Sequence, residues 1–593
     1  MPFLPRLSQF DDQNTKNHDS PLEFSGIQKN CALRPSGAKT RIHCLTLFER
    51  HPKLFVNFSF NMKIIICDPI SPKGIALLQT RPEFEVVVLP KPPTEAELLP
   101  LVADATALVV RSETKVTQKV IEAARKLRVV GRAGVGVDNV DVESATKHGI
   151  VVMNTPGGNT VTTAELSFAM LLSLARKVPQ AHATMVAGKW DRKLFQGVEL
   201  QGKTLGVLGM GRIGTEVAKR AIAFGMHVIG YDPYLTEDRA KAIGAEFAAD
   251  LDAVYRSADF ITVHMPVTKE TKEMLNAAAF AKMKPGVKIV NCARGEIISE
   301  TDLLAALQSK KVAGAAVDVF AVEPLPADHP YRKQENLILT PHLGASTKEA
   351  QEKCGIEVAE VIAGYLLTGE VRNAVNLPYL DAHTYEQVKP YLALGEALGK
   401  LLSQLAPANA DRLYITYGGN ARLLPNIDPI TRAVLRGFLS RSNLPDVNNV
   451  NVRSAAQSIG ITVEEKKSEE PVTFNEWVHV QVFNNGQKLV SAGGTFFGSP
   501  NNPRIVRLFS QSVELPTSGT LLLLNNTDKP GIVGQLGSLL GKYKVNIASM
   551  SLSRDTAGGL ALTVLSLDSV PPQAVLDELK KDTDISNVKV VTL

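Results

Sequence analysis

Short apolar runs alternate with amphipathic stretches from residue 63 to about residue 156. The apolar runs are rich in β-branched residues and read KIIICDP, FEVVVLP, ALVVR, RVVGRAG and IVVMNTP. Segments with helical periodicity, such as VTQKVIEAARKL, lie between them. Strands that alternate with helices predict a parallel sheet built from βαβ units, and a long helix over residues 162–176 follows.

A second series of the same kind runs from Lys203 to about Pro341, and a helix over residues 347–367 follows it. The strands of this series are TLGVLG, HVIGYD, FITVHM, KIVNCA, GAAVDV and LILTPH. The fold class predicted for this half of the chain is therefore α/β, with two doubly wound parallel sheets.

The pattern changes after Leu377 and Pro378. Residues 379–515 mix helical segments (LGEALGKLLSQLA, DPITRAVLRGFLS) with strand segments (RLYITYGG, EWVHVQVF, KLVSAGGTF), which predicts an α+β domain. The charge run EEKKSEEP within it is expected to be a solvated face or a turn. The last 75 or so residues read as one βαββαβ unit, the ferredoxin-like pattern.

Composition narrows the classes of function. The 593 residues are too many for one hydrophobic core, so we expect about three to five domains. The small net charge of +5 gives no reason to propose nucleic acid as a partner, and no apolar run is long enough to span a membrane. The chain has five cysteines: Cys31, Cys44, Cys67, Cys292 and Cys354. They show neither a CxxC pair nor metal-ligand spacing, so we expect a reducing, cytoplasmic compartment and no metal site.

The first 61 residues differ from the rest. They have no apolar segment at the start, which argues against a secretory signal. Their early acidic residues argue against an organellar transit peptide: Asp11, Asp12, Asp19 and Glu23. Met62 stands directly before the first strand. We therefore expect residues 1–61 to be a disordered extension or a mispredicted start, with Met62 as the natural first residue.

The string GMGRIG lies between a predicted strand and a predicted helix. Its glycines Gly209, Gly211 and Gly214 permit a tight turn, close approach to a pyrophosphate and close helix packing. Asp232 ends the next strand, where a carboxylate binds both ribose hydroxyls and repels a 2′-phosphate. The pattern predicts an NAD site. A second glycine-rich string, GRAGVG at residues 131–136, has no Asp at the corresponding strand end.

Three later strands of this half end in polar residues, Arg294, Asp318 and His342. In a parallel sheet these ends face one ligand crevice, so the three side chains are expected to converge on one end of a bound dinucleotide. An arginine can hold a substrate carboxylate in a bidentate pair, and a histidine can take a hydroxyl proton as hydride leaves. Glu323 would orient the imidazole. Taken singly, each has a structural alternative: a turn histidine, an ion-pair arginine, a loop carboxylate.

The strings GMGRIG, NCARGE, DVFAVEP and PHLGAST, in this order and spacing, resemble the D-isomer-specific 2-hydroxyacid dehydrogenase family over residues 63–375. The resemblance implies that His342 is the acid/base, Glu323 its partner and Arg294 the carboxylate anchor. It also implies a set of cofactor contacts: Asp318 to the nicotinamide carboxamide, Arg212 and Ile213 along the pyrophosphate, and Thr114, Met265, Cys292 and Ala345 around the pocket. Position 265 is Met where relatives often have Thr, which removes a hydroxyl contact.

Further strings (VVRSETKV, VVGRAGVGVDNVD, GKTLGVLGMGRIG) are most similar to the branch of this family that oxidises 3-phospho-D-glycerate to 3-phosphohydroxypyruvate at the start of L-serine biosynthesis. Candidate contacts to the substrate and its phosphate are Arg111 with Ser112, Arg132, Gly134 and Arg294. By the same resemblance, Arg192 and Lys193 reach in from a neighbouring subunit of a homodimer or homotetramer. A surface charge is an equally good interpretation of each phosphate candidate taken alone.

The tail is similar to an ACT domain, with NNTDKPGIVGQLG as its signature loop. Such domains sense amino acids, here with L-serine as the candidate effector, and Asp528, Gly531 and Asn546 match effector positions. The preceding region resembles the intervening domain of the long members of this branch, of the allosteric substrate-binding type. The string PRIVRLFSQSVELPTSG departs from the usual pattern of that junction.

The resemblance divides the chain into a substrate-binding domain (62–160 with 346–376), an NAD-binding Rossmann domain (161–345), an intervening domain (377–516) and an ACT domain (517–593). Two other functions stay open at this point. One is a glyoxylate, hydroxypyruvate or D-lactate-type reductase, whose chain usually ends near the helix at 367. The other is an NAD-binding corepressor that recruits peptides, which the ACT-like tail disfavours.

Overall fold

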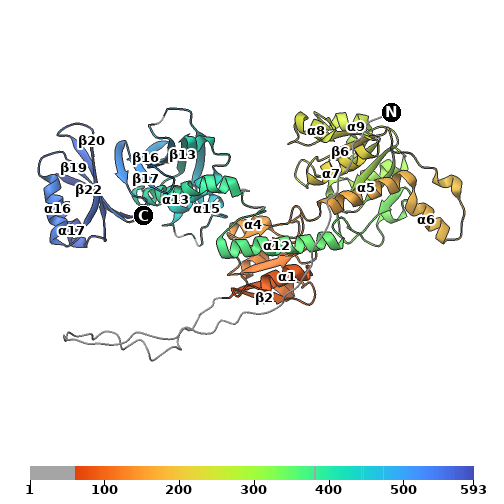
Figure 1. Ribbon diagram of the computed structural model, residues 1–593, viewed down its shortest axis with the longest axis horizontal. Helices are drawn as coiled ribbons and strands as arrows, with labels where there is room; N and C mark the ends of the chain where they lie inside the picture. Colours follow the sequence, from red (N-terminus) through yellow and green to blue (C-terminus); the bar gives the residue numbers. More distant parts are fainter. Residues whose placement is uncertain (1–60, 379–381, 443, 445, 472) are drawn as a thin grey trace, which may run out of the picture. The chain divides into compact units, whose positions relative to one another are not determined.

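The structure is a computed structural model that describes residues 61–378, 382–442, 444, 446–471 and 473–593. The predicted disordered extension therefore lies outside the described residues, except for Asn61. Figure 1 colours the elements by their position along the chain. No helix in the described ranges is long and apolar enough to cross a membrane.

The first sheet is five-stranded and parallel, with the order β2-β1-β3-β4-β5. Its strands match the predicted apolar runs: β1 Met62–Ile66, β2 Phe84–Val88, β3 Ala107–Val110, β4 Val129–Arg132 and β5 Val151–Met153. Helices α1 Pro72–Gln79, α2 Glu95–Leu98, α3 Gln118–Ala123 and α4 Val142–Lys147 connect them. Helix α12 Lys348–Thr368 returns from much later in the chain and packs on α1 (Figure 1), and its residues Val358 and Ile362 join the core of this sheet.

The second sheet is seven-stranded and parallel, with the order β12-β11-β10-β9-β6-β7-β8. Its strands are β6 Thr204–Leu208, β7 His227–Tyr231, β8 Glu246–Phe247, β9 Phe260–Val263, β10 Val287–Asn291, β11 Val312–Val317 and β12 Leu337–Leu339. The helices around it are α5 Thr160–Arg176, α6 Val178–Val186, α7 Arg212–Ala223, α8 Glu237–Ile243, α9 Leu251–Ser257, α10 Ala277–Lys282 and α11 Glu300–Gln308. The chain leaves β6 toward β7 on one side and returns to β9 on the other, so the β6 end is the topological switch point where ligands bind.

The third sheet is mixed and six-stranded, in the order β14-β13-β15-β16-β17-β18. Its strands are β13 Arg412–Gly419, β14 Thr462–Lys467, β15 Glu476–Asn484, β16 Gln487–Phe496, β17 Pro503–Leu508 and β18 Gln511–Leu515, with helices α13 Ala382–Leu405, α14 Asp428–Leu439 and α15 Val452–Ser458. The predicted solvated charge run begins in the exposed edge strand β14, where charged side chains discourage pairing with another chain.

The last sheet is antiparallel, with the order β20-β21-β19-β22, as the ferredoxin-like pattern predicts. Its elements are β19 Thr520–Thr527, α16 Ile532–Lys542, β20 Ile547–Arg554, β21 Leu560–Leu567, α17 Gln573–Lys581 and β22 Ile585–Thr592. One face packs on its own helices, whereas Leu521, Val564 and Val591 on the other face join the core of the six-stranded sheet. The predicted fold class is confirmed: two parallel doubly wound sheets, an α+β domain and a ferredoxin-like domain.

Candidate functional site

The glycine turn between β6 and α7 is shaped to receive an anion. Gly209 has φ of 96°, and a Cβ there would come within 2.5 Å of the carbonyl oxygen of His264. A Cβ on Gly214 would overlap the carbonyl oxygen of Gly209, so α7 lies directly against the end of β6. A Cβ on Gly211, in contrast, would meet open space. No side chain caps α7, so its first amide groups, at Arg212 and Ile213, remain available to a pyrophosphate.

Asp232 closes this turn on the side of β7. Its Oδ2 accepts a hydrogen bond from the amide of Met210 at 3.0 Å, and its Oδ1 accepts one from the amide of Tyr234 at 2.8 Å. Each carboxylate oxygen can accept a second hydrogen bond, which leaves acceptor positions for two ribose hydroxyls. The residues present therefore fit the adenosine half of NAD.

The other predicted cofactor residues are placed in different ways. Met265 is buried beside Gly209, and Ala345 lies in the turn after β12, next to Gly344. The Cys292 thiol is buried against the sulfur of Met170, and burial raises its pKa to about 12. Thr114 is fully buried, and its hydroxyl donates to Asp68 at 2.5 Å, so that hydroxyl is used inside the five-stranded domain.

His342 and Glu323 form the closest pair of catalytic candidates. Nδ1 of His342 lies 2.7 Å from Oε2 of Glu323, and the other Glu323 oxygen accepts the amide of Phe320 at 3.0 Å. The hydrogen bond that His342 donates to Glu323 raises the pKa of His342 against the effect of burial. Burial acts to raise the pKa of Glu323, but the hydrogen bond and charge of His342 outweigh it and lower the pKa. A carboxylate at Nδ1 leaves Nε2 as the nitrogen that can exchange a proton with a substrate.

Asp318 holds the turn that carries His342. It is completely buried and accepts hydrogen bonds from the Thr340 hydroxyl at 2.6 Å and from the amides of Leu343 and Gly344 at 2.7 and 2.9 Å. His342 has φ of 55°, a left-handed conformation that costs about 1–2 kcal/mol for most residues. The bonds to Asp318 offset that cost. They leave Oδ2 with one acceptor position for a further donor.

Arg294 follows β10 and faces the five-stranded domain. Its Nε donates to Oδ2 of Asp138 at 2.9 Å, and its Nη1 donates to the carbonyl oxygen of Ala293 at 2.6 Å. The carbonyl oxygen of Arg294 in turn accepts a hydrogen bond from the Asn291 side chain at 2.9 Å. The Arg294 side chain is 26% exposed.

The substrate candidates of the five-stranded domain lie at the ends of β3 and β4. The Arg111 amide donates to Asp68 at 2.5 Å, and exposed Ser112 follows it. Nε of Arg132 is buried without a hydrogen-bond partner among the described residues, and a Cβ on Gly134 would overlap its Nη1. Burial, and after it the positive charge of Arg294, lowers the pKa of Arg132 to about 10. Arg132 and Arg294 are thus near neighbours, a suitable environment for a doubly anionic substrate.

The predicted effector residues lie in the ferredoxin-like domain. Asp528 accepts hydrogen bonds from Arg554 at 2.5 Å and from the amide of Gly558 at 3.0 Å. Gly531, with φ of 100°, directly precedes α16, and Asn546 donates to Asp568 at 2.7 Å. The side chains of Asp528 and Asn546 are therefore each engaged with a different partner.

Sequence reasoning missed several residues that shape the site. Asp68, at the end of β1, holds the loop of Arg111 and Thr114, and Asn139 donates to the carbonyl oxygens of the same two residues at 2.9 and 2.6 Å. Asp138 pairs with Arg294. The available signal was a polar residue just past a strand for Asp68, and the string GVDNVD for Asp138 and Asn139.

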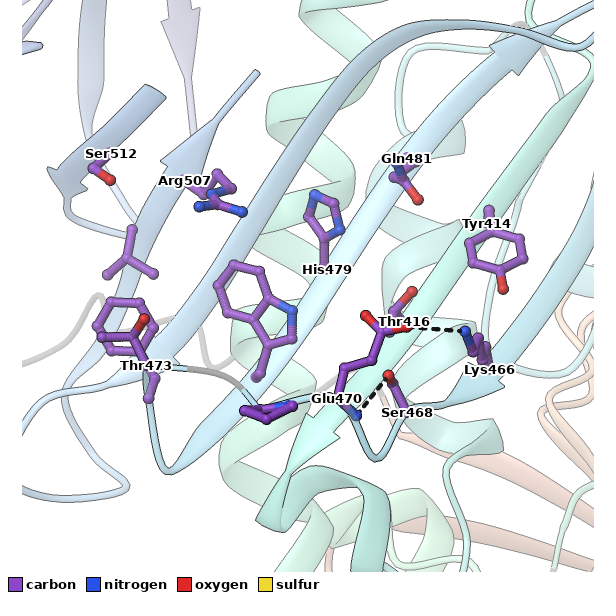
Figure 2. Close-up of a pocket in the computed structure, with 14 residues that line it drawn as sticks. Tyr414, Thr416, Lys466, Ser468, Glu470, Thr473, His479, Gln481, Arg507 and Ser512 are labelled. Atoms are coloured by element: carbon purple, nitrogen blue, oxygen red, sulfur yellow. Dashed lines mark hydrogen bonds and ion pairs between the residues drawn. The ribbon is translucent and has the colours of Figure 1, made fainter. Parts of the chain in front are cut away.

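A separate cavity of about 560 Å³ opens on the six-stranded sheet (Figure 2). The rings of Trp477 and His479 stack at 5.4 Å, and the Arg507 guanidinium lies 5.9 Å from the Trp477 ring. Burial, and then the charges of Arg507 and Lys488, lowers the pKa of His479 to about 4, so this imidazole is neutral. The cavity lies on a different sheet from the glycine turn at residues 209–214 and the His342–Glu323 pair. In the described ranges, no group of three or more His, Cys, Asp or Glu side chains is placed to hold a metal ion.

Comparisons with known proteins agree along the chain. The family model of the D-isomer specific 2-hydroxyacid dehydrogenase NAD-binding domain matches residues 168–344. The D-3-phosphoglycerate dehydrogenase intervening domain matches residues 387–509, and the ACT domain matches residues 520–584.

Similar proteins cover nearly the same length. The chain is 41% identical over 543 residues to a D-3-phosphoglycerate dehydrogenase of Synechocystis sp., covering 91% of this chain and 97% of that protein. The enzyme of the same name from Archaeoglobus fulgidus is 41% identical over 90% of this chain and all of its own length. That of Bacillus subtilis is 40% identical over 90% of this chain and 99% of its own.

Proposed function

The chain belongs to the D-3-phosphoglycerate dehydrogenase family, and we propose that it oxidises 3-phospho-D-glycerate to 3-phosphohydroxypyruvate with NAD, the first step of L-serine biosynthesis. The observation that carries the proposal is the 2.7 Å bond between His342 and Glu323, at the strand ends of the same sheet that bears the glycine turn and Asp232. An alcohol oxidation needs a base beside a dinucleotide, and this arrangement supplies both.

His342 is the proton acceptor in this proposal. Bound NAD supplies the hydride acceptor for C2 of the substrate. Nε2 of His342 takes the proton of the C2 hydroxyl. Glu323, which accepts a hydrogen bond from Nδ1, stabilises the imidazolium that forms. The Nη edge of Arg294 binds the substrate carboxylate, which places the C2 hydroxyl toward His342. Arg111, Ser112, Arg132 and Gly134 form the proposed phosphate side.

The oligomer is part of the proposal. Helix α6 buries none of its side chains and projects from the seven-stranded domain (Figure 1). Its segment exposes several large apolar side chains, with Trp190 80% and Val186 74% exposed. Exposed apolar patches of this kind mark protein interfaces. We therefore propose a homodimer or homotetramer in which Arg192 and Lys193 of this segment reach the partner's substrate cleft.

Regulation and location complete the proposal. Asp528, Gly531 and Asn546 are proposed to bind an amino-acid effector, with L-serine as the first candidate. A cytoplasmic location is supported by Cys67, Cys292 and Cys354, which are buried free thiols, as expected in a reducing compartment.

Replacing His342 tests the assignment. H342A should lower turnover of 3-phospho-D-glycerate by about 10²–10⁴-fold, the contribution of a general base, while NADH binding stays within twofold. Turnover should be measured by NADH absorbance and binding by NADH fluorescence. Unchanged turnover would remove His342 from the mechanism. Faster oxidation of unphosphorylated glycerate than of the phosphorylated acid would favour a glyoxylate or hydroxypyruvate reductase instead.

A further inference from the structure

The ion pair between Arg294 and Asp138 joins residues 156 positions apart. Asp138 lies in the loop between β4 and α4 of the five-stranded domain, and Arg294 lies three residues past the end of β10 in the seven-stranded sheet. The bond therefore connects the proposed carboxylate anchor to the domain that carries Arg111 and Arg132.

The guanidinium of Arg294 is held at Nε, and its Nη edge keeps unused donors. Its Nε is taken by Asp138 and one Nη1 hydrogen by the carbonyl oxygen of Ala293. Nη2 makes no hydrogen bond within the described part of the chain, and it lies over Gly136, where a Cβ would overlap it. Because the guanidinium is planar, fixing Nε fixes the direction of the Nη edge.

The loop that carries Asp138 is itself fixed. Asn139, the next residue, donates to the carbonyl oxygens of Arg111 and Thr114, and Asp141 caps α4 by accepting the amide of Ser144 at 2.9 Å. Asp138 is thus a fixed acceptor, although 69% of its side chain is exposed. Exposed ion pairs add little to folding stability, so a role in stability alone explains the placement poorly.

We propose that Asp138 is a positioning residue for the reaction, which holds the guanidinium of Arg294 by Nε so that its Nη edge faces the substrate carboxylate. This inference rests on the proposed function of Arg294 and adds a residue to it. Without Asp138 the arginine keeps its charge but samples other rotamers, so the substrate carboxylate must order it at each binding event. Binding of the carboxylate should weaken, and binding of NAD should not.

The test compares D138N and D138E with D104N. Asp104 is a matched control, because it is also an exposed aspartate (60%) of the five-stranded domain in a 2.9 Å ion pair, with Lys63. D138N should raise KM for 3-phospho-D-glycerate about tenfold, leave NADH affinity within twofold and leave Tm unchanged. D138E, which keeps the charge, should restore part of the loss. D104N should behave as wild type.

A double-mutant cycle separates positioning from general damage. In an R294K background D138N should have no further effect on KM, because lysine has no Nε edge for the carboxylate to fix. A D138N enzyme with wild-type KM, or an additive double mutant, would overturn the inference. So would equal losses of Tm and activity in D138N and D104N.

A binding measurement keeps this inference distinct from the proposed function. Oxalate, a small dicarboxylate, should bind the wild-type NADH complex and bind the D138N complex about tenfold more weakly. If the wild type is active and D138N binds oxalate equally well, only the role of Asp138 is contradicted. If the wild type does not oxidise 3-phospho-D-glycerate but its oxalate binding still depends on Asp138, only the proposed substrate is contradicted. Absence of oxalate binding to wild type would overturn the role of Arg294 and of Asp138 together.

Discussion

Residues 209–214 and residues 131–136 are glycine-rich turns that each follow a parallel strand, β6 in the first case and β4 in the second. In the first turn a Cβ on Gly211 would meet nothing within 4 Å, and α7 begins uncapped behind it. In the second, a Cβ on Gly134 or Gly136 would overlap a guanidinium, from Arg132 or Arg294. One turn leaves space for a ligand's phosphates, whereas the other leaves space for the chain's own arginines.

Glycine spacing therefore indicates that another group approaches the backbone closely, but it does not identify that group. No Asp stands at the end of the strand that follows the second string, so the sequence predicts no ribose site there. Asp138, two residues after Gly136, lies in the loop before α4 and accepts a hydrogen bond from the Arg294 guanidinium. The two turns can be told apart experimentally by which ligand each glycine substitution affects.

The largest effect is expected for G214A. The added Cβ would strike the backbone carbonyl of Gly209, which cannot rotate away, so α7 must move. Overpacking of this kind costs about 1–3 kcal/mol, and moving the first amide groups of α7 should weaken NAD binding about a hundredfold. Calorimetric Tm and an NADH fluorescence titration measure the two losses. Wild-type values for both would mean that close packing of α7 on β6 is not required.

G136A should affect the substrate and spare the cofactor. Its obstacle is the far end of a side chain, Nη2 of Arg294, which can swing away. We expect an unchanged Tm, NADH affinity within twofold and KM for 3-phospho-D-glycerate raised about tenfold, because the displaced guanidinium no longer faces the carboxylate. Weakened NADH binding in G136A would contradict the distinction between the two turns.

Much of this contrast lay beyond what the sequence could predict. The proposed nucleotide turn at residues 209–214 is a local pattern: strand, glycines, helix and Asp232 occupy one short stretch, so spacing alone predicts it. The approach of His342 to Glu323 was also predictable in outline, since both follow strands of one parallel sheet. Asp138 and Arg294 belong to different sheets, and no periodicity links residues so far apart.

Side-chain direction was the other limit. The sequence gives no sign of what the Thr114 hydroxyl contacts: it donates to Asp68, two residues past the end of β1. Asp318 was expected only at the nicotinamide, whereas three of its acceptor positions hold the turn around His342. In both cases the partner that decides the direction comes from another strand. The short strand β8 was not predicted either, because two residues carry no detectable alternation.

G211A should give the opposite pattern to G136A, with a smaller effect. The added methyl meets open space in the free protein, so Tm should not change. It would stand where the pyrophosphate approaches the backbone, so NADH affinity should fall about fivefold. KM for the substrate at saturating NAD should remain that of wild type. A loss confined to substrate binding would show that the turn at residues 209–214 is not the nucleotide turn.

The smallest expected effect is a shift in the pH dependence of the reaction when Glu323 is replaced. Glu323 raises the pKa of His342, mainly through the hydrogen bond at Nδ1. The neutral imidazole is the form that accepts a proton, so kcat/KM for oxidation falls as pH drops through that pKa. E323Q keeps a hydrogen-bond acceptor but removes the charge, so the pKa of His342 should fall and the acid limb should move to lower pH. The plateau rate should also decrease, because the imidazolium loses its counter-charge.

NADH affinity measured across the same pH range should be identical in E323Q and wild type, since Glu323 and His342 do not contact the turn at residues 209–214. An acid limb that does not move in E323Q would contradict the role of His342 in proton transfer. An NADH affinity that changes with pH in parallel with the acid limb would contradict it as well.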